Sequence, residues 1–192
     1  MTPFLESLFL KKMRSVYPIS DETASLLESH LEECSFARKD LLLREGVLCQ
    51  YVWLLEEGFV RHYWLVGGDE ITTSFSVEGA LIFSMDEFYY GLRSQEYAQA
   101  VEPVRSWRIR VSELEKLMRE NLELASWGRI IHQNEYRRLH RSHKERLTLT
   151  AQERYERFMC DFPEVGRRAS LGHIASYLGI TLSTLSRIRA EK

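Results

Sequence analysis

The chain has 192 residues, a hydrophobic content of 44% and a formal net charge of −2. This length and composition are typical of a globular protein with a substantial core, and no apolar run approaches the ~20 residues that span a membrane. The three cysteines are dispersed and form no Cys-x-x-Cys pair, and Met1–Glu6 has neither the basic start nor the apolar core of a signal peptide, so we expect a cytoplasmic protein without a metal cluster.

The first predicted element is a helix. Ile19–Glu33 has Ser20 as a candidate N-cap, acidic residues in the first turn, and Ala24, Leu27 and Leu31 at helical spacing.

From Cys34 to about Arg110 the pattern changes to short β-type runs separated by glycines. Gly67-Gly68 predicts a hairpin, because both central positions of a type I′ turn need a positive φ. Many short strands at near-regular spacing indicate a sandwich or jelly roll. The predicted strands are Leu41–Leu43, Tyr51–Glu56, Phe59–Val66, Ile71–Val77, Leu81–Ser84, Tyr97–Ala100 and Val104–Ile109.

Three further helices follow. Ser112 and Glu115 suggest a capping box, and Thr150 and Glu153 suggest another, for a helix that ends near Phe162-Pro163. Between them, Leu122 to about Leu147 lacks proline and predicts one long helix. Its broken apolar stripe suits either pairing with a second copy or packing on the same chain. The candidate dimer contacts are Leu124, Trp127, Ile130, Ile131, Asn134 and Leu139.

The C-terminal segment predicts a helix-turn-helix. Ser170 is a suitable N-cap for an amphipathic helix to Leu178, and Gly179 stands where a helix ends in the left-handed conformation. Thr181 is the next candidate cap, for a helix from Leu182 to Ala190. A solvated helical hairpin with no nucleic-acid role is the alternative.

Charge favours the DNA-binding hypothesis. Residues 1–128 hold 13 Lys and Arg against 21 Asp and Glu, whereas residues 129–192 hold 13 against 7. Cations replace the counterions of DNA, and arginine, serine and threonine can contact bases or phosphates. The predicted DNA-contacting residues are Ser170, His173, Thr181, Leu182, Ser183, Thr184, Ser186, Arg187 and Arg189.

Residues 174–188, with their Leu178-Gly179 turn and the run Thr184-Leu-Ser-Arg-Ile188, resemble the DNA-binding segment of the Crp/Fnr family of bacterial transcription regulators. Arg44-Glu-Gly46, Leu54–Arg61 and Gly67-Gly68 resemble the cyclic-nucleotide-binding β-roll of that family. The resemblance implies a homodimer on double-stranded DNA with a near-palindromic operator, and RNA polymerase as a further candidate partner.

The resemblance also bears on DNA specificity. It places Ser186 and Arg187 at base-contacting positions. Ser183 and Leu182 stand where well-known members have a glutamate and an arginine, so neither of their operators is implied. Relatives commonly continue into a β-hairpin wing, and we expect none after Ala190-Glu-Lys192.

A cyclic nucleotide is not the favoured effector. In the family, the glutamate of a Gly-Glu element binds the ribose hydroxyl and the arginine of an Arg-(Ser/Thr)-Ala element pairs with the cyclic phosphate. Here Met85 precedes the acids, and Gln95-Glu96 follows Arg93-Ser94. An added carboxylate repels a phosphate. The candidate effector-pocket residues are Asp86, Glu87, Tyr89, Arg93 and Ser94, with a cyclic-AMP-responsive regulator kept as an alternative.

A cupin-like small-molecule-binding protein or metalloenzyme is the other alternative, because a small β-roll can hold a metal through histidines. Of the six histidines, His62 alone falls on a predicted strand, so no metal or catalytic residues are assigned. The sequence thus predicts an α+β, non-enzymatic regulator with a jelly-roll sensor domain (1–120), a dimerisation helix (121–147) and an all-α helix-turn-helix domain without a wing (148–192).

Overall fold

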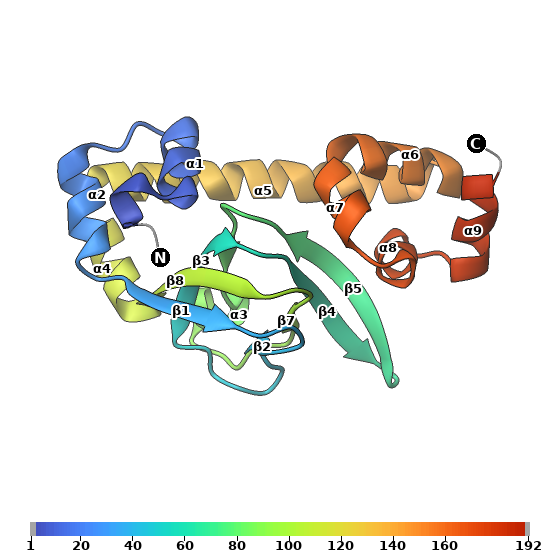
Figure 1. Cartoon of the computed structure of the whole chain (residues 1–192), viewed down its shortest axis with the longest axis horizontal. Helices are drawn as coiled ribbons and strands as arrows, with labels where there is room; N and C mark the ends of the chain where they lie inside the picture. The colour runs from blue at the N-terminus through green and yellow to red at the C-terminus, as the bar shows by residue number, and fades with distance from the viewer. Residues whose placement is uncertain (1–2, 191–192) are drawn as a thin grey trace.

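The computed structural model describes residues 3–190, which form a β-roll, a long helix along one side of it, and a group of C-terminal helices beside the hairpin of residues 60–76 (Figure 1). This arrangement confirms the predicted α+β fold class. The absence of a wing was predicted for the end of the chain, where residues 191 and 192 lie outside the described range.

The roll consists of two four-stranded antiparallel sheets, ordered β1-β8-β3-β6 and β2-β7-β4-β5. Alternate apolar side chains of both sheets, such as Trp53, Leu55 and Val60, fill the space between them. The strands are β1 (Glu32–Phe36), β2 (Leu41–Leu43), β3 (Tyr51–Glu57), β4 (Val60–Val66), β5 (Asp69–Ser76), β6 (Leu81–Ile82), β7 (Tyr97–Ala100) and β8 (Val104–Arg110).

The β4–β5 hairpin has the predicted turn. Val66 pairs with Asp69, and Gly67 and Gly68 between them have φ values of 62° and 95°. Both positions therefore need the left-handed region, which glycine enters without strain.

A second core lies outside the roll, between β3, β8 and the helices η1 (Phe4–Glu6), α1 (Leu8–Val16), α2 (Asp21–Glu28), α4 (Val111–Glu120) and α5 (Leu122–Thr148). Ser20 caps α2 as predicted, but the helix is shorter than Ile19–Glu33 and is followed by β1, which was not predicted. Helices η1, α1 and α3 (Met85–Tyr90) were also not predicted. The capping box at Ser112 is wrong, because α4 begins at Val111 after Arg110.

The prediction that Leu124 and Trp127 contact a second copy is also wrong. They are only 0% and 2% exposed within the single chain, and Trp127 packs edge-on against Phe9 of α1, with ring centres 6.2 Å apart. Ile131 packs against the same core. The reason is that α1, visible beside the first half of α5 in Figure 1, already covers this face.

The C-terminal helices are α6 (Ala151–Asp161), α7 (Pro163–Arg168), α8 (Leu171–Leu178) and α9 (Leu182–Ala190). The predicted capping box is confirmed, since Thr150 and Glu153 each accept from the other's backbone N–H. Pro163 opens the unpredicted helix α7, because proline suits the first position of a helix.

Candidate nucleic-acid interface

Helices α8 and α9 form the predicted helix-turn-helix geometry. The Ser170 hydroxyl accepts from the His173 N–H at 3.2 Å, and Gly179 ends α8 with φ 66°. Ile180 N–H donates back to the Ala175 carbonyl at 3.0 Å, which closes the turn. The Thr181 hydroxyl then caps α9 by accepting from the Thr184 N–H at 3.1 Å.

The two faces of α9 differ in chemistry. Leu185 and Ile188 are 0% and 6% exposed and pack in a core with α6, α7 and α8. The opposite face exposes Leu182, Ser183, Ser186, Arg187 and Arg189, with Thr184 half-buried. Within residues 3–190, neither arginine of α9 has an ion-pair partner. This face therefore presents hydroxyls and two cations that have no ion-pair partner among the described residues.

The N-terminus of α9 is rich in hydroxyl groups. The Thr181 Oγ1 atom lies 2.9 Å from the hydroxyl of Ser183 and 2.9 Å from that of Thr184. The first backbone N–H groups of a helix and its dipole attract anions. The arrangement is chemically suited to a phosphate at the start of α9 and to base edges along its exposed face.

His173, near the start of α8, contacts the roll. Its Nε2 atom lies 3.1 Å from the Arg61 guanidinium in the roll, and because arginine only donates, this nitrogen accepts. Burial and the neighbouring Arg61 charge lower the pKa of His173, which favours the neutral form of the ring. Of the predicted DNA-contacting residues, His173 thus contacts the roll, while Ser170 is exposed at the start of α8.

Contacts between β5 and α8 fix the helix-turn-helix on the roll. Arg61 pairs with Glu70 at 2.6 Å and donates to the Thr72 hydroxyl at 2.9 Å, with a side chain only 3% exposed. The Ser176 hydroxyl accepts from Thr72 N–H at 2.9 Å and donates to the Glu70 carbonyl at 3.2 Å. Helix α8 therefore satisfies backbone groups at the open edge of the sheet.

Arg168 of α7 makes a second polar connection to the roll. Its two terminal nitrogens each lie 2.9 Å from the Glu78 carboxylate, and one also pairs with Glu102. Burial alone would raise the pKa of Glu78, but the hydrogen bonds from Arg168 and from the Gly58 N–H lower it below its ordinary value. Sequence reasoning missed this network, since its partners are distant in the chain.

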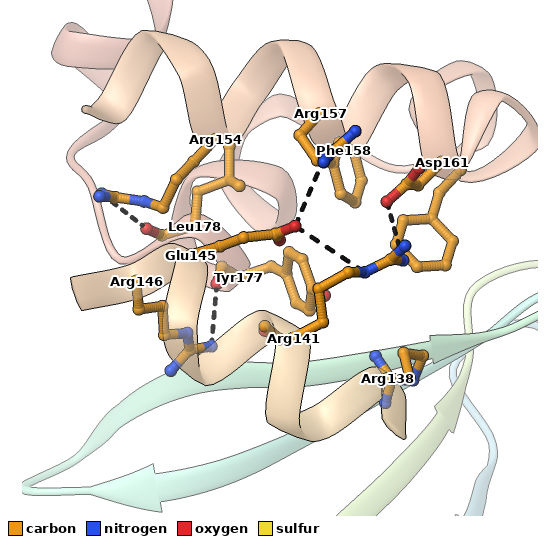
Figure 2. A pocket seen from close by; sticks show the side chains of 12 residues that line it. Arg138, Arg141, Glu145, Arg146, Arg154, Arg157, Phe158, Asp161, Tyr177 and Leu178 are labelled. Atoms are coloured by element: carbon orange, nitrogen blue, oxygen red, sulfur yellow. Dashed lines mark hydrogen bonds and ion pairs between the residues drawn. The ribbon is translucent and has the colours of Figure 1, made fainter. Parts of the chain in front are cut away.

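The end of α8 is held from the other side by arginines, as Figure 2 shows. Arg146 of α5 donates to the Tyr177 carbonyl at 3.4 Å, and Arg154 of α6 donates to the Leu178 carbonyl at 3.3 Å. These carbonyls lie just before Gly179, where a helix has unpaired acceptors and the negative end of its dipole. Both arginines thus position the turn that leads into α9.

The other charged residues between α5 and α6 form ion pairs with one another. Glu145 lies between Arg141 and Arg157, at 3.8 and 3.4 Å, and Arg141 also pairs with Asp161 at 2.9 Å (Figure 2). The cavity among them holds only about 40 Å³, room for a few waters. Many of the arginines that make residues 129–192 positively charged are therefore used in ion pairs and hydrogen bonds within the protein.

The candidate effector residues do not converge on one site. Arg93 is exposed and donates to the Gly46 carbonyl at 2.8 Å, while Asp86 accepts from the Gln95 N–H at 3.2 Å. Ser94 is buried and bonds the backbone of Glu96. Glu87 and Tyr89 line a different cavity of about 510 Å³, beside Arg110 and Ser112.

Two polar side chains that lie close together in the roll, the buried His62 and the partly buried Glu96, were not selected by sequence reasoning. His62 is 7% exposed, with Nε2 at 3.0 Å from the Ser76 hydroxyl and Nδ1 at 3.8 Å from the Glu96 carboxyl. Burial lowers the pKa of His62 to about 4, and burial together with Asp86 raises the pKa of Glu96 to about 7. The group beside His62 is thus a carboxyl group, whereas the guanidinium of Arg93, which belongs to the predicted motif, is exposed.

The described part of the chain contains no cluster of three or more His, Cys, Asp or Glu side chains placed to bind a metal ion. Among residues 3–190 no helix combines the length and apolar content required to cross a membrane.

Residues 33–121 match the model of the cyclic nucleotide-binding domain. Several solved structures share the fold. FixK2 from Bradyrhizobium japonicum is 23% identical with a TM-score of 0.70, over 84% of this chain and 83% of that one. The c-di-GMP-responsive global regulator CLP of Xanthomonas campestris is 15% identical with a TM-score of 0.71, over 90% and 91%. A putative regulator of the Crp/Fnr family from Eubacterium rectale is 14% identical with a TM-score of 0.71, over 92% and 87%. No curated protein matches the sequence.

Proposed function

Because the chain contains a cyclic nucleotide-binding domain and has the fold of the Crp/Fnr-type regulators, we propose that it is a DNA-binding transcription regulator. The observation that carries the proposal is the exposed face of α9, where Arg187 and Arg189 have no ion-pair partner within the described residues while the opposite face is buried. The role is regulatory rather than enzymatic, and the site of action is the cytoplasm.

In this proposal α9 enters the major groove. Ser186 and Arg187 contact base edges, since arginine can donate two parallel hydrogen bonds to a guanine. The hydroxyl cluster of Thr181, Ser183 and Thr184 contacts a phosphate at the helix N-terminus. Ser170, Leu182 and Arg189 flank this surface, and His173 holds α8 on the roll through Arg61.

Dimerisation would use a face of α5 opposite to the buried one. Leu122, Tyr136 and Leu147 are 80%, 74% and 73% exposed, and Leu139 is 52% exposed. Leu122 and Tyr136 are related by the seven-residue repeat of paired helices, and the other two lie on the same side of the helix. Of the dimer contacts predicted from the sequence, Leu139 and Asn134 are exposed and can contact a second copy, and Ile130 is half-buried.

Two copies would present two recognition helices to a near-palindrome with half-sites about 34 Å apart. RNA polymerase is a candidate partner of the DNA-bound dimer. The partly buried Glu96 carboxyl, 3.8 Å from His62 in the roll, supports an effector other than a cyclic nucleotide, because a cyclic phosphate placed beside it would be repelled whenever the carboxyl is ionised.

The direct test compares Arg187→Ala with Arg167→Ala by fluorescence anisotropy on a bound duplex. Arg187→Ala should weaken specific binding by about 1–3 kcal/mol, roughly 5- to 150-fold. Arg167 is exposed but pairs with Glu164 on its own helix, so its variant should bind almost normally. Equal affinities of the two variants for the specific duplex would reject the assigned role of Arg187.

A further inference from the structure

A separate cavity of about 830 Å³ opens beside β2 and the start of β3. The residues that line it lie between Phe36 and Trp53 in the sequence, and none of them belongs to α3, α5 or the helix-turn-helix. Figure 1 places β2 on the side of the roll that faces away from α5. The volume lies in the range of small-molecule sites, about 300–1,000 Å³.

The cavity has an aromatic and aliphatic lining. Trp53 is 6% exposed, and its ring centre lies 6.1 Å from that of Phe36 and 6.4 Å from that of Tyr51. Val47 and Leu48 line the same cavity and remain 48% and 45% exposed. The Trp53 indole N–H is buried without a hydrogen-bond partner, a state that costs free energy until an acceptor arrives.

Two cations border this apolar lining. Within residues 3–190, neither the Lys39 ammonium nor the Arg44 guanidinium has a hydrogen-bond or ion-pair partner. The acid in the lining, Asp40, already accepts from the Ala37 N–H at 2.7 Å. The rim therefore carries two cations against one carboxylate and is positive on balance.

The backbone at Lys39 is also unusual. Its φ is 78°, in the left-handed region that non-glycine residues seldom adopt. The strained residue is held by Lys39 N–H donating to the Ala100 carbonyl at 2.8 Å and by Gln99 donating to the Lys39 carbonyl at 3.2 Å. Strain of this kind persists where the surrounding structure fixes it, and it gathers at functional sites.

We propose that this cavity binds an amphipathic monocarboxylate, with an alkyl or aryl body against Val47, Leu48 and Trp53 and its carboxylate between Lys39 and Arg44. A positive rim over an apolar floor selects an apolar anion above a neutral or cationic molecule of the same shape. Strand β2 belongs to the sheet β2-β7-β4-β5, whose last strand carries α8, so the ligand would contact the same sheet that holds the helix-turn-helix.

The test uses decanoate as the probe, titrated into the full chain without DNA below its micelle concentration and followed by calorimetry and tryptophan fluorescence. We expect saturable binding at one site per chain, at least about tenfold tighter than for decanol or decyltrimethylammonium. Arg44→Ala and Lys39→Ala should each weaken binding about three- to fivefold, as for exposed ion pairs. Trp53→Phe should remove the fluorescence response.

Three control variants test whether decanoate occupies this cavity and no other part of the surface. Arg38 is exposed but does not line the cavity, and Trp64 is half exposed on the distant hairpin, so Arg38→Ala and Trp64→Ser should bind decanoate normally. Arg187→Ala should also bind normally, which keeps this inference distinct from the proposed DNA-binding function. Absence of saturable binding, equal binding of the decyl cation, or loss of binding in Arg38→Ala or Trp64→Ser would overturn the proposal.

Discussion

Replacing Arg168 with alanine should lower the free energy of unfolding by about 2–3 kcal/mol. Arg168 joins α7 to the roll through two 2.9 Å hydrogen bonds to Glu78, an ion pair with Glu102, and a guanidinium carbon 5.2 Å from the centre of the Phe59 ring. Its side chain is 21% exposed. Breaking a fully buried pair costs about 3–5 kcal/mol and an exposed pair at most about 1 kcal/mol, so partial burial places the loss between these limits.

The loss should depend on pH in a defined direction. In the wild type the pKa of Glu78 lies below its ordinary value of 4.5, so the ionised carboxylate stabilises the fold above that pH, and this contribution is lost as the pH falls through the lower folded pKa. Without Arg168, burial and the Glu102 charge raise the pKa of Glu78. The folded Arg168→Ala variant then binds a proton more readily than its unfolded chain. Its loss of unfolding free energy relative to the wild type therefore becomes smaller as the pH falls.

Urea unfolding at pH 7 and pH 5, at one fixed protein concentration, measures both effects. Arg167→Ala is the control, because Arg167 is exposed and pairs only with Glu164, and it should cost no more than about 0.5 kcal/mol. Equal stability of Arg168→Ala and Arg167→Ala at pH 7, or a loss of stability in Arg168→Ala that does not become smaller at pH 5, would contradict the proposed role of Arg168.

Three other outcomes are expected. Tyr136→Glu should convert the proposed dimer to a monomer in sedimentation velocity, whereas Trp64→Glu on the hairpin should not. A dimer that persists in Tyr136→Glu would contradict the proposed dimer face. Burial raises the pKa of Glu96 to about 7, so the free energy of unfolding should fall as the pH rises from 4.5 through 7. In melting curves at pH 5 and 7.5, Glu96→Gln should show a smaller change with pH than the wild type. An equal change in both proteins would contradict the role of Glu96. Gly58→Ala should cost about 1–3 kcal/mol, because φ is 116° and the new Cβ would lie 2.7 Å from the Pro103 carbonyl oxygen, whereas Gly46→Ala meets no atom within 4 Å and should cost less in the same unfolding assay.

The features predicted well from the sequence are those that neighbouring residues determine. The Gly67-Gly68 turn, the Thr150 capping box and the Gly179 helix end each depend on a few adjacent residues, and each is present in the structure. The buried and exposed faces of α9 follow from helical periodicity in the same way.

The errors arise where distant segments meet. Leu124 and Trp127 lie on an apolar stripe whose partner could not be chosen from α5 alone, and α1 of the same chain covers it. The DNA contact of His173 stays a prediction, and no local pattern could indicate that its ring also contacts Arg61, more than one hundred residues earlier. Charge counts likewise could not show that arginines such as Arg168 are used in internal ion pairs.

The most direct test of DNA recognition by α9 is selection of duplexes from a random-sequence DNA library with the wild-type chain and with Arg187→Ala. We expect the wild type to enrich a near-palindromic site with half-sites about one helical turn apart, and Arg187→Ala to lose preference at one base pair in each half-site. Enrichment of no sequence by the wild type, or of the same site with unchanged preference by Arg187→Ala, would contradict DNA recognition by α9.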